Sequence, residues 1–134
     1  MIVIITHAPT GSSLVSALHD ILPNDITKNI VTIDVHIHDN KDEKILEAQQ
    51  LIKQHATDEV LIFTDIVGST PYHIARQTLL ATTEHSCVVV SGVSLPMLIK
   101  AANYRALSLK DWVTQLMKCA LTWVQAEFPP TPTH

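Results

Sequence analysis

Three short, uninterrupted apolar runs, separated by segments with helical patterns, most strongly limit how this chain can fold. The runs are Met1–Ile5, the apolar part of Glu59–Asp65, and Cys87–Val90. Continuous apolar runs of this length are typical of strands that are buried on both faces, and such strands occur in parallel sheets covered by helices. Strands that alternate with helices therefore predict an α/β fold around a parallel sheet.

A fourth segment, Val31–His38, has a different pattern, because its apolar and polar residues alternate without exception. The apolar positions are Val31, Ile33, Val35 and Ile37, and the polar positions are Thr32, Asp34, His36 and His38. A period of two with one polar face indicates a half-exposed strand at the edge of a sheet. Placing this strand outside and the continuous ones inside gives the order 2-1-3-4, a doubly wound, mainly parallel sheet with helices on both faces.

Helical patterns follow each strand, and we expect their starting points from capping residues. Five helices are expected: from about Thr10 to Leu22, from Asp42 to His55, from Thr70, from Pro96, and from Ser108 to about Trp123. Thr10, Ser12 and Ser13 are candidate N-caps for the first helix. Thr70 followed by Pro71 is typical of an N-cap with proline at the first helical position.

The chain has the length of one domain, and it contains no linker or internal repeat. Its 134 residues are 46% hydrophobic and carry a formal net charge of −4. This charge does not favour sequence-independent binding of nucleic acid or anionic lipid. We expect a single domain over residues 1–128, and then a loose tail over 129–134, where the prolines cannot continue a helix.

The cysteines and the amino-terminal apolar run indicate a cytoplasmic protein. Cys87 and Cys119 form no metal-binding or redox motif, and two scattered cysteines suit a reducing compartment. The apolar run at the start of the chain is too short to cross a bilayer and has no basic flank. We therefore expect neither a signal peptide nor stable insertion into a membrane.

Two residues whose side chains could take part in a reaction stand at strand ends: His7 after the first apolar run and Asp65 after the third strand. In the order 2-1-3-4 these two strands are neighbours, so the residues should face each other at the carboxyl edge of the sheet. A carboxylate that accepts one ring N–H fixes the imidazole tautomer and leaves the other nitrogen free as a nucleophile. A purely structural hydrogen bond between the two residues is the alternative.

The loops that follow these two strands favour phosphoryl chemistry. APTGSS and IVGST each precede a helix, and the N–H groups at helix amino ends stabilise phosphoryl oxygens. Neither loop contains lysine or arginine, which argues against tight binding of a nucleoside triphosphate and suits a phosphoryl group in transit.

Three segments at matching separations carry a family resemblance: IVIITHAPTGSSL, VLIFTDIVGSTPYHIA and VVVSGVSLPMLIKA. They resemble the phosphocarrier IIA domain of the mannose-type bacterial phosphoenolpyruvate–sugar phosphotransferase system, over nearly the whole chain to about Tyr104. The resemblance implies that His7 takes a phosphoryl group from phospho-HPr and passes it to a separate IIB protein, for sugar uptake or regulation. It also implies that Asp65 orients His7, that Ser69 and Thr70 cradle the phosphoryl group, and that no cofactor takes part.

The resemblance has departures and a consequence for assembly. Ala8–Pro9 and Gly68–Ser69 stand where the family usually has a glycine and a glycine pair. The family forms homodimers through a swapped C-terminal strand, which 121–128 would have to supply here as an additional antiparallel edge strand.

Other functions remain as alternatives. A phosphoaccepting receiver domain would need an acidic pair after the first strand and a lysine after the fifth, and neither is found. A flavodoxin-like module that binds flavin or phosphate without phosphotransfer is the main alternative, because TGSS can imitate its hydroxyl-rich loop. Asp34, His36 and His38 have the spacing of some metal sites. We interpret them instead as the solvated face of an edge strand, and we expect no metal.

Overall fold

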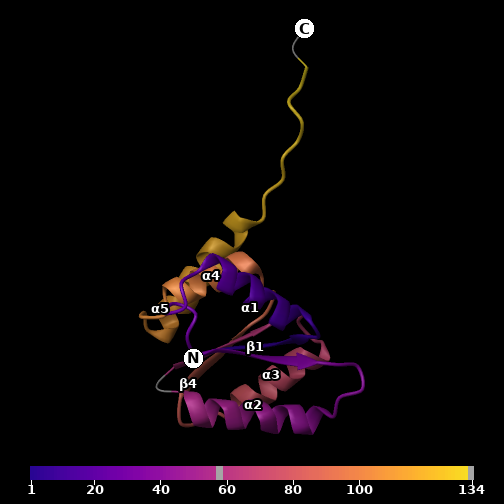
Figure 1. Cartoon of the computed structure of the whole chain (residues 1–134), viewed down its shortest axis with the longest axis vertical. Helices are drawn as coiled ribbons and strands as arrows, with labels where there is room; N and C mark the ends of the chain where they lie inside the picture. The colour runs from indigo at the N-terminus through magenta and orange to yellow at the C-terminus, as the bar shows by residue number, and fades with distance from the viewer. Residues whose placement is uncertain (57–58, 133–134) are drawn as a thin grey trace.

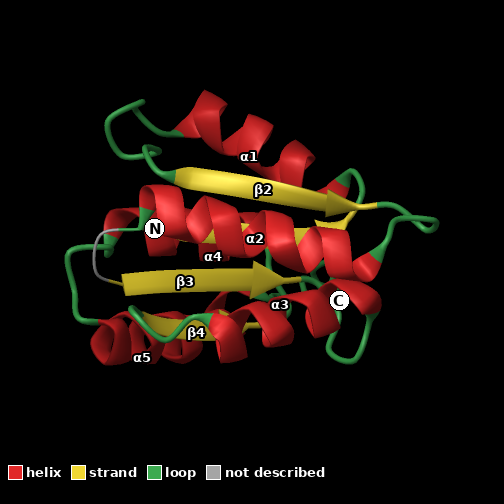
Figure 2. Cartoon of the chain, turned by 90° about the horizontal axis from the view of Figure 1, so that it is seen from below, coloured by secondary structure: helices red, strands yellow, loops and turns green. Residues whose placement is uncertain are grey.

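The computed structural model describes residues 1–56 and 59–132 and contains one four-stranded parallel sheet. Its strands are β1 (Ile2–His7), β2 (Ile30–Val35), β3 (Glu59–Thr64) and β4 (Ser86–Val90). They lie in the order β2-β1-β3-β4, and all neighbouring pairs are parallel. Figure 2 shows β2, β3 and β4 pointing in the same direction. The predicted fold class and strand order are confirmed.

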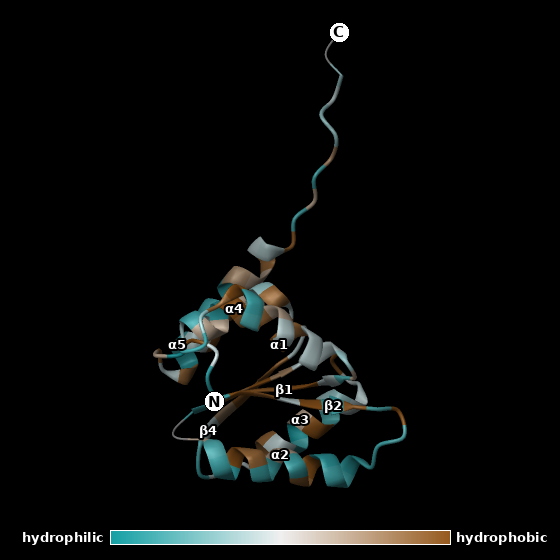
Figure 3. Ribbon diagram, in the orientation of Figure 1, coloured by the Kyte–Doolittle hydropathy of each residue, from teal (hydrophilic) through white to brown (hydrophobic). Residues whose placement is uncertain are grey.

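Helices cover both faces of the sheet (Figure 1). One face packs against α1 (Thr10–Ile21), α4 (Leu95–Asn103) and α5 (Leu109–Ala120), and the other against α2 (Lys41–His55) and α3 (Thr70–Ala81). The central strands are apolar along their length, as Figure 3 shows, because side chains from both of their faces enter a core.

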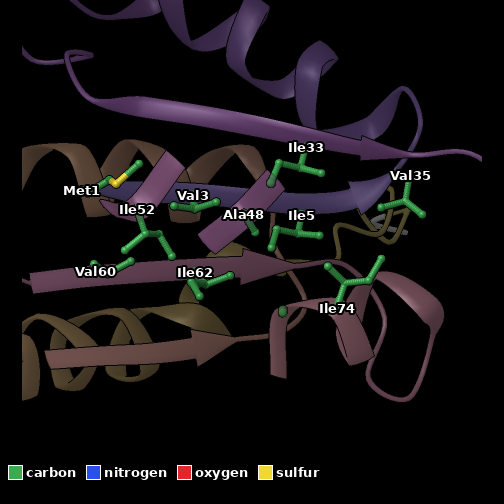
Figure 4. Packing of buried hydrophobic residues seen from close by; sticks show 11 residues of the cluster. Met1, Val3, Ile5, Ile33, Val35, Ala48, Ile52, Val60, Ile62 and Ile74 are labelled. Atoms are coloured by element: carbon green, nitrogen blue, oxygen red, sulfur yellow. The ribbon is translucent and has the colours of Figure 1, made fainter. Parts of the chain in front are cut away.

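Successive residues of β1 divide between the two cores. Val3 and Ile5 pack toward α2 and α3, next to Ile62 of β3, as Figure 4 shows. Ile2 and Ile4 pack toward α1, α4 and α5. All of these side chains are fully buried, so β1 and β3 form a rigid base for whatever follows their carboxyl ends.

The edge strand β2 ends earlier than the alternation predicts. It stops at Val35 instead of His38, and Ile37 is 93% exposed. The cause is a turn, in which Asp39 Oδ2 accepts the His36 N–H at 2.7 Å and the Asp39 N–H donates to the His36 carbonyl. The predicted strand over Val31–His38 was therefore wrong in its last three residues.

The start of α3 also differs by one residue from the prediction. Ser69 is the N-cap residue in an extended conformation, and Thr70 already belongs to the helix. Pro71 is therefore the second helical residue instead of the first, although it still lies in the first turn. The Ser69 hydroxyl donates to the Ile66 carbonyl, which leaves the first turn of α3 without a side-chain cap.

The last helix begins at its predicted cap, Ser108, and ends in a short 3₁₀ helix, η1 (Leu121–Trp123). Residues 124–132 have no helix or strand and extend away from the body of the molecule (Figure 1). Within the described part of this single chain they add no strand to the sheet, so β4 forms its second edge. Among residues 1–56 and 59–132, no helix combines the length and apolar character needed to cross a bilayer.

Candidate functional site

His7 and Asp65 meet at the carboxyl ends of the neighbouring strands β1 and β3. His7 is the last residue of β1, and Asp65 directly follows β3. The His7 ring atom Nδ1 lies 2.7 Å from Asp65 Oδ2, and the same oxygen accepts the His7 backbone N–H at 2.9 Å. The structure thus brings together the two residues that the strand order predicted to face each other.

Asp65 is held as a carboxylate by the donors around it. Its side chain is only 15% exposed, and its second oxygen accepts the Ile66 N–H at 2.9 Å. Burial raises the pKa of Asp65, but the hydrogen bonds from the His7 N–H, the His7 ring and the Ile66 N–H together outweigh it, so the pKa lies below its ordinary value. A carboxylate only accepts hydrogen bonds, so the proton of a neutral His7 ring is on Nδ1.

The other ring nitrogen of His7, Nε2, therefore carries the free lone pair. The His7 side chain is 49% exposed, so an external group can reach it. The loops after β2 and β3 flank the end of β1, and they carry the exposed apolar residues Ile37, Ile66 and Val67. The arrangement can perform nucleophilic attack at an open surface.

The amino end of α1 is capped by side chains from two strands. Thr6 Oγ1 of β1 accepts the Gly11 N–H at 2.7 Å, and Asp34 Oδ1 of β2 accepts the Ser12 N–H at 3.3 Å. The Ser12 hydroxyl donates to Asp34 Oδ2 at 2.5 Å. The N-cap residue is Pro9, with no side-chain bond of its own.

The prediction that Thr10, Ser12 or Ser13 caps α1 was therefore wrong. The acceptors for the N–H groups of its first turn come from β1 and β2 instead of from these neighbouring residues. The sequence did not single out Thr6, and it indicated Asp34 only as a solvated strand residue or metal ligand, not as a cap. The available signals were a hydroxyl residue at the end of an otherwise apolar run and an acidic residue in a strand.

The amino end of α3 is open by comparison. The Ser69 hydroxyl donates to the Ile66 carbonyl at 2.7 Å, so it makes no cap. Within residues 1–56 and 59–132, the Thr70 hydroxyl and the N–H groups of Thr70 and Tyr72 have no hydrogen-bond partner. These groups lie in the turn and first helical turn that follow Asp65, where an anion would meet free donors.

The polar residues of β2 do not form one solvated face. Asp34 is bound to Ser12, which corrects that interpretation, and the His36 ring lies 3.4 Å from Asp39 Oδ2. In the part of the chain that the structure describes, no group of three or more His, Cys, Asp or Glu residues could hold a metal ion.

Comparison with known protein families agrees with the geometry of the site. A family model described as "PTS system fructose IIA component" (EIIA-man) matches residues 1–116. The chain belongs to this family. It is thus a IIA component of the mannose/fructose type in the sugar phosphotransferase system.

Solved structures show the same fold. A phosphotransferase system EIIA component from Streptococcus agalactiae is 21% identical, with a TM-score of 0.84 and coverage of 93% of this chain and 95% of that chain. A mannose/sorbose specific IIA subunit from Enterococcus faecalis is 17% identical, with a TM-score of 0.84 and coverage of 98% and 97%. No protein of curated function gives a significant match.

Proposed function

We propose that this IIA component carries a phosphoryl group on His7, which it accepts from phospho-HPr and passes to a IIB domain or protein in the cytoplasm. The observation that supports this most is the 2.7 Å contact between His7 Nδ1 and Asp65 Oδ2, because in the neutral ring it places the proton on Nδ1 and leaves the lone pair on Nε2 of an exposed side chain. Family membership supports the partners.

The transfer of the phosphoryl group to His7 needs no additional base to remove a proton. The Nε2 lone pair attacks phosphorus, and the bond between phosphorus and the donor breaks with its electron pair leaving on the donor. The Nδ1 proton stays in place, so the phosphorylated ring carries positive charge next to the Asp65 carboxylate. When the phosphoryl group passes on to the IIB protein, the same positive charge makes the ring of His7 a good leaving group.

We propose that Thr70 and the amino end of α3 hold the phosphoryl oxygens. The unpartnered N–H groups of Thr70 and Tyr72 and the Thr70 hydroxyl follow Asp65 closely in the chain, and helix amino ends favour dianions. Ser69 takes part through the turn that it closes with Ile66.

The surface around His7 suits a protein partner. Ile37, Ile66 and Val67 are exposed apolar residues in the two loops beside the histidine. Such residues are typical of surfaces that dock another protein rather than enclose a small molecule. Together with the family match, they favour a phosphocarrier over the flavodoxin-like alternative.

We also propose that the C-terminal segment, residues 121–128, forms a homodimer contact. Leu121, Val124 and Phe128 are almost fully exposed, and the outer edge of β4 has no strand partner within the described chain. Exposed apolar residues next to an open strand edge favour pairing with a second copy.

The proposed function is tested by incubation with phosphoenolpyruvate, enzyme I and HPr, followed by intact mass measurement. The protein should gain one phosphoryl group, which should disappear on acid treatment and remain in base. The His7→Ala variant should gain none, whereas His55→Ala, which removes an exposed histidine at the end of α2, should behave like the wild type. A label that survives acid or remains in His7→Ala would contradict the assignment.

A further inference from the structure

The amino ends of α1 and α3 both lie near His7, but they differ in which of their N–H groups have side-chain acceptors. Thr6 and Asp34 are paired residues in the register of β1 and β2, and both accept N–H groups from the first turn of α1. Thr6 is fully buried, and the Ser12 hydroxyl bonds the same Asp34 carboxylate. Strand side chains thus bind the N–H groups of Gly11 and Ser12, whereas the Thr10 N–H has no partner within the described residues.

These bonds also fix the short segment that contains His7. It runs from His7, the last residue of β1, to Thr10, the first residue of α1, with Thr6 immediately before it and Gly11 and Ser12 immediately after it. In its middle, the Ala8 N–H donates to the Val35 carbonyl at 3.0 Å. Asp34 therefore holds one end of a short segment whose other end places the reacting imidazole.

A second consequence concerns the phosphoryl group. Free N–H groups attract anions to a helix amino end, but at α1 two of them are bound, and one of their acceptors is already a carboxylate. A phosphoryl dianion would meet like charge there. At α3 the N–H groups of Thr70 and Tyr72 are free within the described chain, and no carboxylate caps the helix.

Building on the proposed function, we propose that Asp34 is a positioning residue for the reaction of His7. Its carboxylate fixes the loop after β1 and closes the amino end of α1 to anions, so that the phosphoryl group on His7 is directed toward the open amino end of α3. Asp34 itself does not touch the reacting atoms in this account.

Two variants of Asp34 and one matched control test the proposal. Asp34→Ala removes the acceptor of the Ser12 N–H, whereas Asp34→Asn keeps an oxygen for that N–H and an amide that can donate to the Ser12 hydroxyl. Ser108→Ala removes the cap of α5, which bonds the Asp111 N–H. Ser108 lines a cavity with Met1 and Glu59 at the amino ends of the strands, far from His7.

We expect Asp34→Ala to lower the rate of His7 phosphorylation by roughly tenfold, as a small misplacement of a reacting group does, without changing the KM for phospho-HPr. Asp34→Asn should restore most of the rate, and Ser108→Ala should lose stability without losing rate. An unchanged rate in Asp34→Ala, or an equal loss in Ser108→Ala, would overturn the positioning role.

A binding measurement separates this proposal from the proposed function, because it needs no HPr. Inorganic phosphate is titrated into the ¹⁵N-labelled proteins. The Ser12 amide signal should shift with phosphate in Asp34→Ala and should stay in place in the wild type and in Asp34→Asn. A Ser12 signal that responds equally in wild type and Asp34→Ala would overturn the closure of α1, whereas failure of wild-type phosphorylation alone would contradict only the phosphocarrier function.

Discussion

One oxygen of Asp65 accepts both the backbone N–H and the ring of His7, while the other accepts the Ile66 N–H. An asparagine has only one oxygen, so its NH₂ group must face one of these donors. We therefore expect Asp65→Asn to slow phosphorylation of His7 without stopping it, in contrast to His7→Ala. Single-turnover phosphorylation measures the difference, with Asp42→Asn on α2 as a control for the loss of one charge.

Because the pKa of Asp65 is lowered, the effect of Asp65→Asn on the free energy of unfolding should depend on pH. Above the pKa of an unfolded aspartate, about 3.9, the carboxylate contributes its full stabilisation, and this is lost as the pH falls through the lower folded value. The difference in free energy of unfolding between wild type and Asp65→Asn should thus shrink as the pH falls below about 3.9. Urea titrations at several pH values measure it. A difference that grows on acidification would contradict the assigned shift.

Gly11 is a second residue whose replacement has a clear expected effect on the free energy of unfolding. A Cβ at position 11 would lie 2.7 Å from Thr6 Oγ1 and 3.1 Å from Ile4 Cγ2, both in the buried interior. Alanine favours a helix over glycine by about 1 kcal/mol. The forced shift of α1 costs about 1–3 kcal/mol and outweighs that gain.

We therefore expect Gly11→Ala to lower the free energy of unfolding, and the exposed neighbour Ser13→Ala to leave it unchanged or raise it slightly. Chemical denaturation of both variants provides the measurement. Equal stability of the two variants would show that the close approach of Gly11 to β1 is not a constraint.

Residue chemistry made His7 and Asp65 predictable, while Thr6 and Asp34 were not. A histidine and an aspartate that end buried strands can be read from the sequence once the strand order is known. The caps of α1 depend on a register between β1 and β2 that no local pattern contains. Local capping rules therefore selected Thr10, Ser12 and Ser13, although the acceptors come from the strands.

At the scale of elements, continuous apolar runs located the central strands because helices cover both of their faces. Strand β2 was located by its alternation but extended too far, since alternation continues through Ile37 while the Asp39 turn ends the pairing. A single side-chain bond in a turn can thus end a strand whose residue pattern would continue it.

The C-terminal segment is the element whose role is most open to experiment. Residues 124–132 have no regular structure, and both cores are complete without them. We expect a chain that ends at Trp123 to fold and to be phosphorylated, but to run as a monomer where the full chain is a dimer. Light scattering measures the mass, and circular dichroism checks the fold. A truncated chain that stays dimeric would place the interface elsewhere.

For the whole molecule, the strand order could be derived because one half-polar strand must lie at an edge and three apolar stretches must lie inside. That order placed His7 beside Asp65 before any contact was known. The open α3 end and the closed α1 end could not be derived in this way, since they depend on which N–H groups find acceptors in three dimensions.

In the proposed reaction, Asp65 holds Nδ1 of His7 so that chemistry occurs at Nε2. The most direct measurement is heteronuclear NMR of the ¹⁵N-labelled protein after phosphorylation, which identifies the ring nitrogen that is coupled to phosphorus. We expect phosphorus on Nε2, with the Nδ1 proton retained in its bond to Asp65. Phosphorus on Nδ1, where the Asp65 contact would have to break, would contradict it.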